Sequence, residues 1–216
     1  MTFLKSPLFL RCASAFVLAP AVLTAIWFGA WPFWGMVFLA CAIGVYEWLN
    51  VAAKTKFDLV VSVIGILYIA LAAISFALLR EMGIFVILAL LLPVWGSDIG
   101  AYAAGRLIGG PKMAPAISPN KTWAGLGGAV AAGILALWGL SAVTVFHIPL
   151  HFMIFFGAVI ALSGQAGDLL VSFLKRKAGV KDTGTLIPGH GGLLDRIDSL
   201  LLAAPVFLLL LKVLMK

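Results

Sequence analysis

The sequence predicts an all-α integral membrane protein, a polytopic helical bundle of about seven transmembrane helices with a polar site at its cytoplasmic face. Of the 216 residues, 63% are hydrophobic and 11% are charged, whereas soluble domains have about a quarter of their residues charged. The apolar residues form long runs without the alternation of barrel strands, so the spans are expected to be helices. The basic residues gather on one side of the predicted membrane.

Seven apolar runs are long enough to cross a bilayer, which takes about 20 residues. We expect spans at 10–29, 32–52, 59–79, 84–105, 123–146, 151–172 and 199–215. The first run lacks a small-residue cleavage site, so we interpret it as a span and not as a removed signal peptide. The stretch "GAWPFWG" is interpreted as a tight turn between the first two spans. Cys12 and Cys41 lie in apolar runs and suggest neither disulfides nor a metal site.

The charges predict the orientation of the bundle. With the N-terminus in the cytoplasm, twelve Lys and Arg residues face the cytoplasm and three face outward, which is a strong positive-inside bias. We divide the chain into N-terminal transmembrane helices, 1–95, and a catalytic transmembrane region, 96–216, which carries both long cytoplasmic connections as one structural unit. We expect an integral protein of the bacterial inner membrane, with the N-terminus and the active site in the cytoplasm.

Acidic residues provide the first candidates for a functional site. Asp195 and Asp198 are three residues apart, a spacing that places both carboxylates on one face of a helix. Asp168 lies inside a predicted span, where an ionisable side chain is costly and indicates function, and Ser172 follows it one helical turn later. Converging carboxylates favour Mg²⁺ or Mn²⁺ over zinc. Alternatively, Asp195 and Asp198 cap a helix and pair with Arg196.

Basic residues surround these acids. Lys175, Arg176, Lys181 and Arg196 have the chemistry to bind phosphates, the arginines through two parallel hydrogen bonds. A membrane anchor is the alternative explanation for such a cluster. The acids mixed among the bases, Asp182 included, favour a site for a metal ion and an anionic substrate, because an anchor has no use for them.

The segment "PGHGG" is expected to form an irregular turn. Gly191 and Gly192 permit positive φ and a close approach of the backbone to a ligand, and consecutive amides in such a turn can bind an oxyanion. His190 can donate to a phosphate or act as an acid or a base. A plain chain turn, without any ligand, is the alternative.

The connection around residues 97–125 carries a second polar set. Asp98 stands within a predicted span, and Arg106 follows it on the cytoplasmic side. The motif "SPNKT" offers Ser118, Lys121 and Thr122 as hydrogen-bonding groups, although it does not match a phosphate-binding loop. A structural ion pair between Asp98 and Arg106 is the alternative.

The stretch "SFLKRKAGVKDTGTLIPGHGGLLDRID" closely resembles the signature of phosphatidate cytidylyltransferases, also called CDP-diacylglycerol synthases. "GDL" from Gly167 and "GAYAAGRLIGG…SPNKTWAG" are also similar to the family, so the resemblance extends from about Gly96 to the C-terminus. Two positions depart from the pattern: Ala124 and Val171 stand where members of the family commonly have Glu.

The resemblance implies that CTP and phosphatidate react to give CDP-diacylglycerol and pyrophosphate, by in-line attack of the lipid phosphate on the α-phosphorus of CTP. Mg²⁺ is expected at Asp168, Asp195 and Asp198, and a second metal ion is left open. Lys175, Arg176 and His190 are expected to join these acids in catalysis. The expected substrate-binding residues are Asp98, Arg106, Ser118, Lys121, Thr122, Ser172, Lys181, Asp182, Gly191, Gly192 and Arg196.

The expected partners are CTP, phosphatidate in the inner leaflet and the lipid bilayer, without nucleic acid; a homodimer is left open. Two alternative functions are kept. One is a related CTP-dependent enzyme acting on another lipid phosphate or on a lipid alcohol, of the prenyl or archaeal type. The other is a transporter, in which Asp98 and Asp168 would line a path through the membrane.

Overall fold

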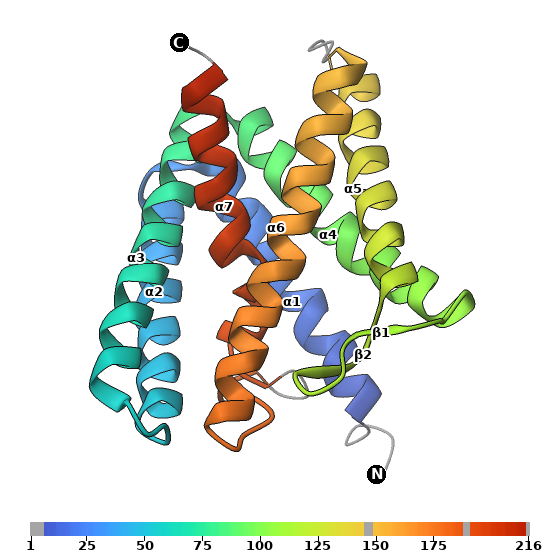
Figure 1. The fold of residues 1–216 in the computed structure, drawn as a ribbon. Coiled ribbons are helices and arrows are strands. Elements are labelled where there is room, and N and C mark those ends of the chain that lie inside the picture. The colour runs from blue at the N-terminus through green and yellow to red at the C-terminus, as the bar shows by residue number, and fades with distance from the viewer. Residues whose placement is uncertain (1–6, 145–148, 188–190, 215–216) are drawn as a thin grey trace.

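The computed structural model describes residues 7–144, 149–187 and 191–214 of the chain. These ranges contain helices and one short antiparallel hairpin (Figure 1). The elements are α1 (Pro7–Phe28), α2 (Ala30–Ala52), α3 (Asp58–Met82), α4 (Ile84–Leu107), β1 (Lys112–Ala114), β2 (Ser118–Thr122), α5 (Trp123–Val143), α6 (Leu150–Lys177) and α7 (Leu194–Leu214). Helices α2 to α7 are long and apolar enough to cross a membrane. The predicted all-α polytopic membrane protein is therefore confirmed.

The helices form one bundle in which α6 and α7 cross the middle, with α2 and α3 on one side and α5 on the other (Figure 1). Helix α1 begins and α7 ends at opposite ends of this bundle. The end that carries the α2–α3 turn, the hairpin and the α6–α7 connection (residues 53–57, 108–122, 178–187 and 191–193) is called the loop end below. The seven helices of the described ranges account for this placement of the two termini.

Single glycines make the two short turns at the other end of the bundle. Gly29 (φ 64°) separates α1 from α2, and Gly83 (φ 140°) separates α3 from α4. Arg80 of α3 reaches the first of these turns, where its Nε donates to the Ile26 carbonyl at 2.6 Å and its Nη2 donates to the Trp27 carbonyl at 3.3 Å. A Cβ on Gly29 would lie 2.7 Å from Arg80 Nη2. The end of α1 is therefore fastened by a side chain of α3.

Helices α4, α5 and α6 approach one another through small residues. A Cβ on Gly96 would lie 3.1 Å from the Ala132 carbonyl oxygen, and one on Gly133 would lie 2.9 Å from the Gly157 carbonyl oxygen. Small residues let membrane helices pack with their backbones in close contact. This packing brings Asp98, on α4, beside the polar residues of α6.

Helix α7 lies equally close to α6 at the loop end. A Cβ on Gly167 would lie 2.6 Å from the Asp198 carbonyl oxygen. Next to this contact, Val171 and Leu194 are fully buried in an apolar cluster that also contains Trp48. Val171 therefore belongs to the core, at a position where the family resemblance implies Glu.

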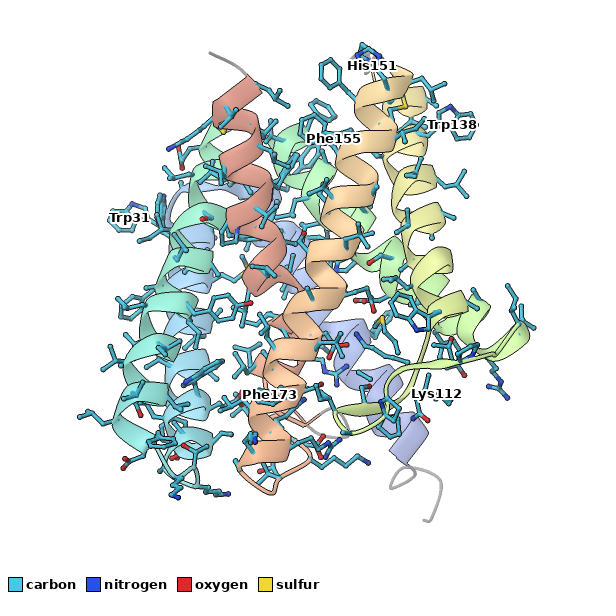
Figure 2. All side chains as sticks on the ribbon, viewed as in Figure 1. Trp31, Lys112, Trp138, His151, Phe155 and Phe173 are labelled. Atoms are coloured by element: carbon cyan, nitrogen blue, oxygen red, sulfur yellow. The ribbon has the colours of Figure 1, made fainter. Side chains whose placement is uncertain are left out.

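The outer surface of the bundle is apolar. Figure 2 shows that Trp31 and Trp138 point away from the helices, and their side chains are 88% and 56% exposed. Large apolar side chains facing outward suit a bilayer, and tryptophan is enriched where the bilayer meets water. Several polar residues of these helices, among them Glu47, Gln165 and Lys175, are instead buried inside the bundle.

The predicted regions 1–95 and 96–216 share this bundle. Their boundary falls inside the continuous helix α4. Helices α2 and α3, from the first region, pack against α7, from the second. The first region thus packs beside the polar residues of the second, and its helix α2 contributes a residue to the site.

Candidate active site

Two hollows meet at the loop end. The first, called the acidic hollow, has a volume of about 390 Å³ and is lined by Asp98, Asp168, Lys175, Asp182, Asp195, Arg196, Asp198 and Ser199. The second, called the hairpin hollow, has a volume of about 210 Å³ and lies between α4, α5, α6 and the hairpin. Asp98 and Asp168 line both hollows. The structure therefore brings together acids from α4, α6 and α7 that are far apart in the sequence.

Lys121 connects the hairpin with the acids of the two hollows. Its Nζ lies 2.6 Å from Asp168 Oδ2 and donates to Gln165 Oε1 at 2.9 Å. Gln165 Nε2 donates to Asp98 Oδ1 at 3.1 Å, and Ser172 Oγ donates to Asp168 Oδ1 at 3.1 Å. These contacts hold both oxygens of the Asp168 carboxylate, and Gln165 binds the Asp98 carboxylate.

Asp195 is the most constrained carboxylate of the acidic hollow. Its Oδ1 lies 2.7 Å from Lys175 Nζ, and the exposed fractions of the two side chains are 4% and 9%. Its Oδ2 accepts hydrogen bonds from the backbone amides of Thr183 at 2.9 Å and Gly192 at 3.1 Å. Thr183 Oγ1 lies 3.1 Å from the same oxygen. Asp195 thus tightens the first turn of α7, and its ion-pair partner is Lys175, not Arg196.

Asp198 has a different environment, although it lies less than one helical turn away. It lines the acidic hollow, and its Oδ1 accepts a hydrogen bond from the Ser199 amide at 2.8 Å. Within the described ranges, the ion pairs are Lys121–Asp168 and Lys175–Asp195. The Asp198 carboxylate therefore faces the hollow without a cationic partner from the described part of the chain.

The sequence of the chain is similar to those of known proteins. The model of the cytidylyltransferase family matches residues 54–214 of the chain. The chain belongs to this family. It is therefore a nucleotidyltransferase and an integral membrane enzyme.

Relatives named phosphatidate cytidylyltransferase cover most of the chain. The chain is 36% identical to the protein of Rickettsia bellii over 211 residues, which are 94% of this chain and 90% of the relative. It is 35% identical to the protein of Rickettsia felis over 94% of this chain and 91% of the relative. The protein of Brucella suis is 43% identical over 152 residues, which are 67% of this chain and 54% of the relative.

The three arginines predicted to bind substrate or to act in catalysis lie in different places. Arg196 lines the acidic hollow. Arg176 lines neither hollow. Its Nε donates to the Ile117 carbonyl at 3.1 Å and its Nη1 to the Val180 carbonyl at 3.3 Å, so it ties the hairpin to the α6–α7 connection. Arg106 donates to the Tyr102 hydroxyl at 2.7 Å and lines neither hollow, so no ion pair with Asp98 forms.

The remaining predicted residues belong to the connections. Thr122 caps α5, where its hydroxyl accepts the Gly125 amide at 3.0 Å, and Ser118 pairs with Ala114 across the hairpin. The connection 97–125 thus contains a hairpin where the sequence suggested a loop. Lys181 and Asp182 are exposed, and Asp182 lines the acidic hollow.

The glycines of the signature pack closely against the carboxylates. Gly191 has φ of 82°, which favours glycine. A Cβ there would lie 2.9 Å from Asp195 Oδ2. A Cβ on Gly192 would collide with Thr183 Oγ1. His190 lies outside the described residues, so its predicted role stays a prediction.

The sequence analysis missed several polar residues of the site, and two of them lie inside apolar runs. Gln165, 5% exposed, joins Asp98 to Lys121. Glu47, 3% exposed, lies on α2 and accepts hydrogen bonds from the Leu193 amide at 2.9 Å and the Leu194 amide at 2.7 Å. Each is a polar side chain inside an apolar run, which is the same signal that identified Asp168. Glu47 also lies before residue 54, where the family match begins.

The carboxylate oxygens of the site are the candidate ligands for a metal ion. No group of three or more His, Cys, Asp or Glu side chains in the described ranges is arranged to hold one. Asp168 and Asp195 instead each hold the ammonium group of a lysine. The donors are carboxylate oxygens, which Mg²⁺ prefers, and they already bind cationic groups. The chemistry of the residues therefore fits a divalent cation, provided that the two lysines move.

Proposed function

We propose that the chain transfers the cytidylyl group of CTP to phosphatidate and releases pyrophosphate. The observation that carries this proposal is that five charged residues of the signature line one hollow at the loop end of a membrane-spanning bundle: Lys175, Asp182, Asp195, Arg196 and Asp198. The choice of substrate is supported by relatives that align with 94% of this chain and are named phosphatidate cytidylyltransferase. A site at the edge of the membrane is accessible to a two-tailed lipid and to a nucleotide from water.

The reaction requires little covalent chemistry from the protein. An oxygen of the lipid phosphate forms a bond to the α-phosphorus of CTP, while the bond from this phosphorus to the oxygen bridging to the β-phosphate breaks. Both reactants are anions, so positioning and charge neutralisation provide the catalysis. Lys121, Lys175 and Arg196 have the positions and the charge to neutralise the phosphates.

A divalent cation belongs to this proposal. Asp168, Asp195 and Asp198 would hold Mg²⁺, which when bound supplies positive charge next to the triphosphate. Five carboxylates and two cationic side chains line the acidic hollow, so an anionic substrate needs additional positive charge there. Lys121 and Lys175, once they leave their carboxylates, bring their ammonium groups to the phosphates.

The function is tested by pyrophosphate release from purified protein in detergent, with CTP, phosphatidate and Mg²⁺. We expect release with all three components and none when any one is omitted, because each takes part in the transfer. Inactivity toward phosphatidate would contradict the proposed substrate if it came together with pyrophosphate release from CTP and a prenyl phosphate, or with CDP release from CTP and a lipid alcohol. Release that does not depend on Mg²⁺ would contradict the metal ion.

The proposed orientation places the loop end and the N-terminus in the cytoplasm. Cysteines introduced at Ala116 and Thr185, both exposed, are expected to resist a membrane-impermeant thiol reagent in intact cells and to react in inverted vesicles. The native Cys12 and Cys41 are first replaced by alanine. A cysteine at Glu81, exposed at the opposite end of α3, is the matched control and is expected to react in intact cells. Labelling of position 116 or 185 from outside would overturn the orientation.

A further inference from the structure

We infer that Glu47 is a positioning residue of the transfer site, because its carboxylate fixes the first turn of α7 and, through Thr183, the carboxylate of Asp195. This inference rests on the proposed function. Glu47 lines neither hollow, so it acts on the site through other residues and does not touch the substrates. It comes from α2, in the half of the chain that has no part in the signature.

The Glu47 carboxylate is buried without a cation. Its exposed fraction is 3%, and within the described ranges both ion pairs involve other acids. A buried carboxylate is stable only if its oxygens accept hydrogen bonds. Oε1 accepts the Leu193 amide at 2.9 Å, and Oε2 accepts the Leu194 amide at 2.7 Å. Oε2 also lies 3.1 Å from Thr183 Oγ1.

These donors belong to the start of α7. The first amides of a helix have no acceptor within the helix, and a negative charge next to them is favourable because of the helix dipole. A capping side chain usually comes from a residue next to the helix, whereas Glu47 reaches the Leu194 amide from 147 positions earlier. The cap thus joins α2 to α7 and leaves the first turn of α7 little freedom to rotate.

Thr183 connects this cap with the acidic hollow. Its hydroxyl oxygen lies 3.1 Å from Glu47 Oε2 and 3.1 Å from Asp195 Oδ2. A hydroxyl has one hydrogen, so it donates to one of the two carboxylates at a time. Its amide donates to Asp195 Oδ2 at 2.9 Å, and the other oxygen of Asp195 binds Lys175. A change at Glu47 is therefore transmitted to Asp195 and Lys175.

The connection before α7 is shaped around Glu47. A Cβ on Gly184 would lie 2.8 Å from Glu47 Oε1, and one on Gly192 would lie 2.5 Å from Oε2. The backbone therefore touches the carboxylate from two sides. Such close packing means that a change of a single atom in the side chain disturbs the connection.

Apolar contacts hold α7 in the bundle independently of Glu47. Leu194 is fully buried and Leu201 is 2% exposed, in the same cluster as Trp48 and Val51. Burial of apolar surface provides most of the packing energy but no direction. Directional hydrogen bonds to Glu47 set the rotation of the first turn, and this rotation determines where Asp195 and Asp198 point.

The test compares Glu47→Gln with the native protein. Glutamine has the same shape, but its amide group would face one of the α7 backbone amides, donor against donor. We expect kcat for pyrophosphate release to fall at least about tenfold, with KM for CTP changing less than about threefold, because the orientation of the acids is lost while the binding groups remain. Glu81→Gln, an exposed acid at the other end of the bundle, is the control and is expected to leave both values unchanged.

Amide hydrogen exchange of the protein without CTP or Mg²⁺ gives a readout independent of activity. We expect Glu47→Gln to speed exchange at residues 183 and 193–194, where its partners lie, but not in the middle of α7 or α6. Unchanged exchange there, or faster exchange throughout these helices, would overturn the inference. If the native protein does not release pyrophosphate but exchange responds as expected, the proposed function fails and the positioning contact stands.

A second pair of variants keeps the inference testable if Glu47→Gln does not fold. Thr183→Val removes the hydroxyl that connects Glu47 with Asp195 and keeps the shape of the side chain. We expect kcat to fall at least about threefold for Thr183→Val and to be largely restored by Thr183→Ser, which keeps the hydroxyl. Equal kcat values for Thr183→Val and the native protein would show that Glu47 does not act on Asp195.

Discussion

Replacement of Asp198 by asparagine is expected to lower pyrophosphate release at least about a hundredfold, which corresponds to about 2.7 kcal/mol of transition-state stabilisation, while the protein stays folded. Asp198 lines the acidic hollow, and no Lys or Arg of the described ranges forms an ion pair with it. Its hydrogen bond is the one from the Ser199 amide. An asparagine oxygen can accept this same hydrogen bond, so the variant removes charge from the hollow and leaves no buried partner unpaired.

The measurement combines initial rates with thermal unfolding in detergent. Glu81→Gln is the matched control, because it also removes one carboxylate charge but at an exposed position outside the hollows. Retention of more than about a third of the activity by Asp198→Asn would contradict a role in charge placement during the transfer. A fall of activity accompanied by an equal loss in folded protein would assign Asp198 to stability instead.

Replacement of Lys175 by methionine is expected to destabilise the protein by about 3–5 kcal/mol, because it leaves the buried Asp195 carboxylate without its cation. The two side chains are 9% and 4% exposed and lie 2.7 Å apart. Activity is expected to disappear as well, since Lys175 lines the acidic hollow. Asp195→Asn is expected to destabilise the fold as well, because it leaves the buried Lys175 ammonium without its carboxylate partner.

The pair is best measured as a double-mutant cycle. The variant Lys175→Met/Asp195→Asn removes both charges, so we expect it to unfold at a higher temperature than Lys175→Met alone, with a coupling of about 1–3 kcal/mol. Lys177→Met is the control, since Lys177 is exposed on the same helix and lies over the Phe173 ring. Additive effects of the two single changes would contradict a direct interaction between Lys175 and Asp195.

The helices could be predicted from the sequence because a lipid environment permits few backbone structures. A backbone inside a bilayer must satisfy its own hydrogen bonds, so each long apolar run became a helix close to its predicted place. Differences occur where the polar loop end begins. Helix α7 starts at Leu194, five residues before the predicted start at 199, and α6 continues to Lys177, past the predicted end at 172. Hydropathy cannot detect these polar turns, although the spacing of Asp195 and Asp198 indicated a helix there.

The contacts of the site were less predictable, because they depend on how helices pack. The spacing of Asp195 and Asp198 suggested equal roles on one helix face. Their different environments result from the position of Lys175, 20 residues earlier on α6, and from the close approach of α7 to Gly167. The role of Glu47 could not be predicted from the sequence for a similar reason. Its partners are mainly backbone amides, and no spacing in a sequence reports a hydrogen bond to the backbone.

The contact of Arg80 with the end of α1 has a consequence for the order of assembly. Chain synthesis proceeds from the N-terminus, so α1 and α2 are made before Arg80. The carbonyl of Ile26 receives this donor from a residue 54 positions later, at a helix end where the last carbonyls have no partner within the helix. The first helix can therefore gain this contact only when the third lies beside it, and a chain that stops before Arg80 would leave the end of α1 without this fastening.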